Sequence, residues 1–149
     1  MKLKTPANPD ATHFSHQITV SESDIDLLNH ANNLSYIRWV QDVAVAHSFK
    51  LGMQLSDYQA MGAVFIIKRH EIDYLRPALL GDALRVDTWV PNARGASCER
   101  ATEITRLSDN VVVARAMTTW VFIDTQTGRP KKVPNDVRLR WGFSPRGHD

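Results

Sequence analysis

The sequence contains a single cysteine, Cys98, among its 149 residues. One cysteine excludes an internal disulfide and a zinc site built from several thiolates. Long apolar runs are also missing, because the longest, Ala63–Ile67, is far short of the roughly 20 residues that a transmembrane helix needs. The basic start of the chain has no apolar run behind it, so we expect no signal peptide and a cytoplasmic protein.

The formal net charge of +2 is too small to indicate a nucleic-acid partner by itself. Hydrophobic residues make up 43% and charged residues 23%, which is typical of a soluble globular domain and excludes a disordered chain. We expect one domain over residues 1–149, with a loose leader over 1–12 and a basic tail over about 138–149. The basic residues near the C-terminus are either a solvated tail or a patch for a phosphate-bearing ligand; they are Arg129, Lys131, Lys132, Arg138, Arg140 and Arg146.

Hydrophobic periodicity predicts a strand, a long helix and then four more strands. Alternating apolar residues indicate a half-buried strand over residues 13–21. Apolar residues then recur every three or four positions from 34 to 51, which predicts a helix, and a shorter helix is expected over about 56–61. The later strands are predicted over residues 63–75, 83–90, 97–107 and 111–123.

The long predicted helix is apolar on nearly all sides, so other structure must wrap it. Asn32 or Asn33 is a suitable N-cap for this helix, and Gly52 a suitable terminator. A sheet face also needs an apolar cover. The sequence therefore predicts an α+β hotdog fold, in which a curved antiparallel β-sheet wraps around one long central helix. A single sheet layer leaves an edge strand open, so we expect a homodimer or homotetramer.

Chemically active side chains concentrate just before this helix, between Asp24 and Tyr36. Two carboxylates, an imidazole and several amides occupy this segment. The free N–H groups of a helix N-terminus carry a partial positive charge, which can stabilise an oxyanion on a carbonyl. A carboxylate beside such a helix end supplies a base or nucleophile. The combination suits acyl transfer.

Structural explanations of the same residues are also open. Asp24 and Asp26 could cap turns, because Asp is common in turns for local hydrogen-bonding reasons. His30 could be a structural histidine. A metal site built from these three residues is conceivable, but the rest of the sequence supplies no matching ligand cluster. We therefore expect no metal.

The segment resembles the signature of acyl-CoA and acyl-ACP thioesterases of the 4-hydroxybenzoyl-CoA thioesterase type. Their pattern, Asp-x-Asp-x-x-Gly-His-x-Asn-Asn-x-x-Tyr, precedes the long helix of a hotdog fold. The resemblance continues in residues 72–78 with Gly81 and Asp82, and in residues 127–130 with 133–134. The residues that match the signature itself are Asp24, Asp26, His30, Asn32, Asn33 and Tyr36.

The resemblance implies a thioester hydrolase that acts on an acyl-CoA or acyl-carrier-protein substrate without a metal or redox cofactor. It makes Asp26 the catalytic carboxylate, acting as general base on water or attacking the thioester carbonyl itself. The backbone N–H of Asn33 would hold the thioester oxygen, and its side chain would brace the loop or cap the helix. His30 would orient the water or Asp26.

Two positions depart from the family patterns. Asn29 stands where many members have Gly, and Asn is among the few residues that tolerate a left-handed conformation, so we expect the loop to be kept. The plant acyl-ACP thioesterases place an Asn two residues after the second Asp, where this chain has Leu28. A catalytic role of that Asn cannot be transferred to this chain.

Substrate-binding residues are predicted at two places. Tyr36 could line an acyl pocket or simply belong to the core. Arg94, Gly95 and Ser97 form a turn where, by the resemblance, pantetheine and phosphates are handled, although an ordinary polar hairpin turn explains them equally well. Arg129, Lys131 and Lys132 are weaker phosphate-binding candidates.

Two other functions stay open at this stage. A hotdog hydratase or dehydratase would use a His and a carboxylate on the helix, for which His47 and Asp42 are available. A non-catalytic acyl-thioester binding module would need no base, and the presence of both Asp26 and His30 argues against it.

Overall fold

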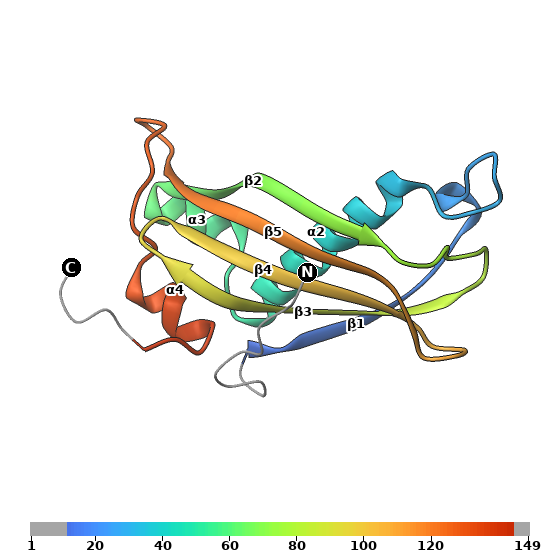
Figure 1. The fold of residues 1–149 in the computed structure, drawn as a ribbon. Helices are drawn as coiled ribbons and strands as arrows, with labels where there is room; N and C mark the ends of the chain where they lie inside the picture. The colour runs from blue at the N-terminus through green and yellow to red at the C-terminus, as the bar shows by residue number, and fades with distance from the viewer. Residues whose placement is uncertain (1–11, 145–149) are drawn as a thin grey trace.

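The computed structural model describes residues 12–144. Five antiparallel strands form one sheet in the order β1-β3-β4-β5-β2 (Figure 1). The expected leader, apart from Thr12, and the end of the expected basic tail with Arg146 lie outside the described residues. The elements are β1 (Phe14–Thr19), η1 (Glu22–Asp24), α2 (Asn33–Lys50), α3 (Leu55–Met61), β2 (Ala63–Tyr74), β3 (Ala83–Arg94), β4 (Ser97–Arg106), β5 (Val111–Asp124) and α4 (Asn135–Arg140).

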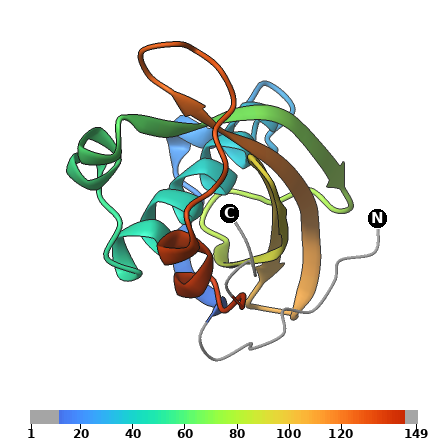
Figure 2. The same cartoon turned by 90° about the vertical axis from the view of Figure 1, so that its left-hand side faces the viewer.

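The sheet bends around α2, as the two views in Figures 1 and 2 show. Trp39 and Val43 of the helix pack in one core cluster with Leu84, Val86 and Ile104 of the sheet. Full burial of such a side chain contributes about 1.5 to 3 kcal/mol relative to leaving it in water. These contacts confirm the predicted α+β hotdog architecture, with a curved antiparallel sheet around one long helix.

The ends of α2 follow from local residue chemistry. The side chain of Asn32 accepts a hydrogen bond from the backbone N–H of Leu34 at 2.8 Å, so Asn32 is the N-cap. This contact leaves the Asn33 side chain without the capping role expected for it. Gly52, with φ of 81°, follows the C-cap residue and ends the helix as predicted.

A single protomer does not cover α2 on all of its apolar sides. Leu34, Val45 and Phe49 are 71%, 50% and 54% exposed. One sheet covers only one side of a helix, and these three side chains lie on the uncovered side. Contiguous exposed apolar surface is a general feature of interaction sites in proteins.

One predicted strand boundary needs correction. The strand expected to stop at Pro91 continues as β3 to Arg94, because the register shifts between Trp89 and Asn92. Proline lacks a backbone N–H for the ladder, and a bulge is the place in a sheet that tolerates it.

No helix within residues 12–144 is long and apolar enough to span a membrane.

The expected basic tail begins instead with the helix α4. Val137 and Trp141 are buried in the second core cluster, which holds this helix against the sheet. Arg138 donates to the carbonyl of Ala93 at 3.0 Å, and Arg140 to the carbonyl of Leu51 at 2.6 Å. These two cations therefore have structural partners.

Candidate active site

The loop between β1 and α2 is anchored by Asp24. Its carboxylate is buried, accepts from the backbone and hydroxyl of Ser21, and forms an ion pair with Arg38. Burial alone would raise the pKa of Asp24, but the hydrogen bonds from Ser21 and Ser35 and the charge of Arg38 lower it below its ordinary value. Asp24 thus positions the loop.

Asp26 lies in the tight turn that follows. Its Oδ1 accepts from the backbone N–H of Leu28 at 2.8 Å and from that of His30 at 3.3 Å. Within residues 12–144, Oδ2 of Asp26 accepts no hydrogen bond, so one carboxylate oxygen is available to a reactant. Asn29 adopts φ of 61°, which confirms that an Asn can occupy the glycine position of the family pattern.

The N-terminus of α2 offers one free donor beside Asp26. The N–H of Leu34 donates to the Asn32 side chain, and the N–H of Ser35 donates to the Asn32 carbonyl. Among the described residues the N–H of Asn33 has no acceptor. The donor is therefore available at the positive end of the helix dipole, as an oxyanion-binding group must be.

These groups share one cleft of about 430 Å³, which brings together four of the predicted site residues. They are Asp26, His30, Asn33 and Tyr36. His30 contacts Asp26 through its backbone, and its ring is exposed. The sequence reasoning did not assign a site role to the opposite wall, Tyr74–Pro77, although residues 72–78 carried part of the family resemblance.

Tyr36 belongs to both the cleft and the core. It is 3% exposed, and its hydroxyl oxygen accepts from the backbone N–H of Ala78 at 3.0 Å. Its ring packs edge-on against Trp39 and Tyr74. Burial raises the pKa of Tyr36, so the hydroxyl stays protonated at neutral pH. The residue joins the helix to the opposite wall.

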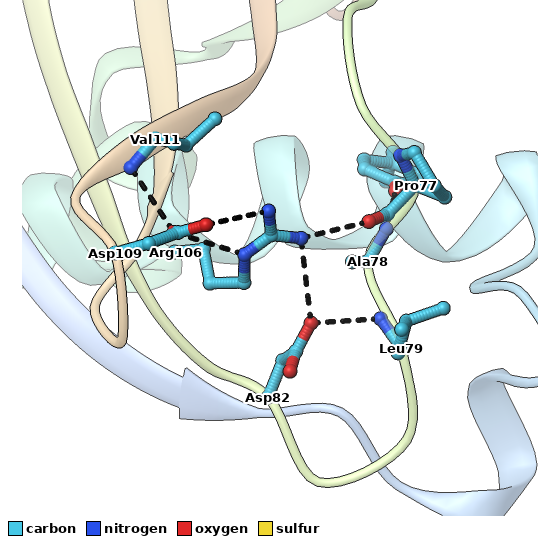
Figure 3. Close-up of polar contacts among 8 residues, drawn as sticks. Pro77, Ala78, Leu79, Asp82, Arg106, Asp109 and Val111 are labelled. Carbon is cyan, nitrogen blue, oxygen red and sulfur yellow. Dashed lines mark hydrogen bonds and ion pairs between the residues drawn. The ribbon is translucent and has the colours of Figure 1, made fainter.

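Arg106 holds that wall from behind (Figure 3). Its guanidinium donates to the carbonyl of Pro77 at 3.0 Å and forms an ion pair with Asp82 at 3.8 Å. It also contacts Asp109 in the turn between β4 and β5, at 2.9 and 3.0 Å. Asp82 in turn accepts from the backbone N–H of Leu79 at 2.9 Å. One arginine thus joins two loops beside the cleft.

The predicted carrier-binding turn lies elsewhere in the protomer. Arg94, Gly95 and Ser97 stand between β3 and β4, at the end of the sheet opposite the Asp26 loop (Figure 1). The 12 residues of β3 separate the two ends, which corresponds to about 36 Å at about 3.3 Å per residue. A single protomer does not bring this turn to the cleft.

The residues of the hydratase alternative are not assembled. His47 is buried and its Nδ1 accepts from Arg100 at 2.8 Å. Burial first, and then the charge of Arg100, lower the pKa of His47 to about 3, so this imidazole is neutral at physiological pH. Asp42 is exposed. Within residues 12–144 no cluster of three or more potential metal ligands occurs.

Two known proteins are similar in sequence to this chain over most of its length. The long-chain acyl-CoA thioesterase FadM of Escherichia coli is 29% identical over 126 residues, which cover 82% of this chain and 92% of that protein. A chloroplastic palmitoyl-acyl carrier protein thioesterase of Gossypium hirsutum is 22% identical over 135 residues. That match covers 87% of this chain but 33% of the plant protein, so the chain spans about a third of this relative.

A solved structure shares the fold of this chain, and a family model matches most of its length. A 1,4-dihydroxy-2-naphthoyl-CoA thioesterase from Synechocystis superposes with a TM-score of 0.81 at 18% identity, over 87% of this chain and 96% of that one. This similarity shows the fold. A family model for the thioesterase-like superfamily matches residues 20–140, which confirms the predicted class of thioester hydrolase. The chain therefore belongs to the thioesterase-like superfamily.

Proposed function

We propose that the cleft at the N-terminus of α2 hydrolyses the thioester of an acyl-CoA, or of an acyl carrier protein, to a free acid and a thiol. One observation carries the proposal: the Asp26 carboxylate and the free N–H of Asn33 line the same cleft. The names of the relatives, which act on acyl-CoA and acyl-carrier-protein thioesters, support this substrate class.

Asp26 performs the reaction in one of two ways. As a general base it takes a proton from water while the water oxygen bonds to the thioester carbon, and the carbon–sulfur bond then breaks with sulfur leaving as a thiolate. As a nucleophile, its oxygen displaces the thiolate, and water then cleaves the mixed anhydride. A thiolate leaves without an acid catalyst, because a thiol has a pKa of about 8.5.

The other cleft residues assist this chemistry. The N–H of Asn33 stabilises the negative charge that develops on the thioester oxygen, a contribution of about 3 kcal/mol per donor in comparable sites. His30, exposed at the cleft, orients the attacking water. Tyr36 forms part of the cleft lining on which the substrate rests.

A homodimer would complete the site. β2 is an edge strand, and the uncovered side of α2 next to it is apolar. Antiparallel pairing of two β2 edges would reverse one protomer relative to the other. The partner's Arg94, Gly95 and Ser97 would then lie at the same end as the Asp26 loop. Across this interface, the turn is available to the pantetheine and phosphates of the carrier.

Release of free thiol from a panel of acyl-CoAs tests the proposal. Asp26→Asn should lower kcat by at least about 1,000-fold, since it removes the base or nucleophile of the reaction. Asp42→Asn is the matched control, because Asp42 is an exposed carboxylate on α2 that does not line the cleft. Circular dichroism checks that both variants fold.

Two results would overturn the assignment. Near-normal turnover by the Asp26→Asn variant would remove Asp26 from its role. Saturable binding of acyl-CoA by the unmodified protein without thiol release would indicate the binding module instead.

A further inference from the structure

A second cavity, of about 210 Å³, lies between the C-terminal half of α2, helix α3 and the start of β2. Its walls are mostly apolar and include Val45, Leu55, Val64 and Phe65. A cavity of about 150 Å³ holds a benzene molecule, so this one admits a ring or a short chain of similar size. The mechanism above uses none of these residues.

Arg100 supplies a buried positive charge to this cavity. It lines the cavity and is 6% exposed. Its Nη1 donates to Nδ1 of His47 at 2.8 Å and to Oγ1 of Thr88 at 3.2 Å, and both acceptors are neutral. None of the ion pairs within residues 12–144 includes Arg100. Burial lowers its pKa only to about 10, so it is a cation at neutral pH.

A second donor lies on the neighbouring strand. Trp120 is one of the residues that line the same cavity. Its indole Nε1 is buried and has no hydrogen-bond partner among the described residues. Neither a guanidinium nor an indole N–H can accept a hydrogen bond. The Cys98 thiol, which also lines the cavity, supplies no anion, because burial raises its pKa to about 12. The Arg100 and Trp120 donors thus suit an anionic acceptor.

The cavity and the Asp26 cleft occupy opposite ends of β2. Val64 and Phe65 lie near the start of the strand, whereas Tyr74 at its end lines the Asp26 cleft. Ten residues of strand correspond to about 33 Å, too far for a short acyl group within one protomer. In the proposed dimer, antiparallel β2 pairing places the start of one strand beside the end of the other. The cavity then opens beside the partner's Asp26.

We propose, on the basis of the thioesterase function and dimer above, that this cavity receives the far end of the acyl group and that Arg100 binds a carboxylate there. The substrate class is then the thioester of a dicarboxylic acid rather than of a simple fatty acid. A carboxylate would offset the desolvation cost of the buried guanidinium. Trp120 donates the second hydrogen bond to the same group.

Matched substrate pairs test this inference. Adipoyl-CoA and hexanoyl-CoA, suberoyl-CoA and octanoyl-CoA, and sebacoyl-CoA and decanoyl-CoA differ only in the terminal carboxylate. The protein should prefer the diacid in at least one pair. Arg100→Met should lower the ratio of the two kcat/KM values in that pair by about 10-fold to 100-fold, the usual effect of a hydrogen bond to a charged group. The ratio is independent of the fraction of folded enzyme.

Two further variants make the result specific. Trp120→Phe removes one donor and should lower the same ratio by a smaller factor. Arg115→Met neutralises an arginine that pairs with Glu103 outside the cavity, and it should leave the ratio unchanged. Preference for the monoacid in all three pairs, or an unchanged ratio in Arg100→Met, would overturn the inference. Thiol release from other acyl-CoAs but from none of these six would also overturn the inference, whereas absence of thiol release from every acyl thioester tested would refute the proposed function.

Discussion

Asp24 and Asp26 are two positions apart in the sequence, yet the structure gives them opposite tasks. Asp24 is buried with Arg38 as its charge partner, whereas the carboxylate of Asp26 is held only by two backbone N–H groups and faces the cleft. Sequence reasoning placed both in one acidic loop and allowed both to be turn caps. The two roles can be distinguished only when it is known that the Arg38 side chain, one turn into α2, reaches Asp24. The spacing of the residues in the sequence does not give that contact.

Asn29 tests how strongly this loop depends on its backbone geometry. The φ of 61° costs about 1 to 2 kcal/mol in a residue with an ordinary Cβ, less in Asn and nothing in Gly. Asn29→Gly should therefore keep kcat within about threefold, whereas Asn29→Val should lower both kcat and the free energy of unfolding. Thiol-release kinetics and urea unfolding measure the two effects. Equal activity of the Gly and Val variants would show that the turn does not position Asp26.

At the scale of the elements, the cleft depends on two loops that a single side chain joins. Arg106 contacts Pro77, Asp82 and Asp109 from the end of β4. Arg106→Met should raise KM about tenfold with a smaller change in kcat, because the Tyr74–Pro77 wall loses its support while Asp26 and α2 keep theirs. It should also lower the free energy of unfolding by about 1 to 3 kcal/mol.

Arg85→Met is the control for this prediction. Arg85 pairs with Asp87 within β3 rather than with either loop, and its side chain is more exposed than that of Arg106. Steady-state kinetics and urea unfolding on the two variants separate a local effect on the cleft from a general loss of charge. An unchanged KM in Arg106→Met would mean that the wall does not need this arginine.

Most elements could be predicted from the sequence because their signals are local. Periodicity, an Asn cap and Gly stops locate α2 and α3, and alternation locates the strands. The extension of β3 past Pro91 could not be predicted, because it depends on a bulge opposite β4. Helix α4 was missed because it is short and three of its six residues are charged, and only Val137 and the following Trp141 attach it to the core.

The sequence predicts part of the site but not how its parts are assembled. The Asp26 loop was predicted because its residues are contiguous and lead directly into a helix. The Tyr74–Pro77 wall and the distance from the Arg94–Ser97 turn depend on how the sheet folds, which one-dimensional patterns do not report. The buried Arg100 sits in a strand in which seven of the ten residues are polar or charged, so an arginine there gives no sign that its side chain points inward.

At the scale of the whole molecule, the charges on β2 favour antiparallel pairing with a second copy. Arg69 and Glu71 form an ion pair on the exposed edge strand. Because antiparallel pairing reverses one strand, the Arg69 of one copy lies near the Glu71 of the other when the pairing is centred between them. The charges on the two β2 edges are then complementary to each other. The apolar side of α2 lies beside this edge in each copy.

Charge reversal on this edge tests the dimer and the shared site together. Glu71→Arg should place four cations at the centre of the pairing, weaken the dimer by about tenfold or more, and lower thioesterase activity in parallel, because the Asp26 cleft loses the partner's contribution. The double variant Arg69→Glu/Glu71→Arg restores complementarity and should restore both properties. Sedimentation equilibrium and thiol-release assays over a range of protein concentrations measure them. A monomer of 16.8 kDa with full activity would contradict a site that spans two copies, and it would confine the chemistry to the Asp26 cleft of a single chain.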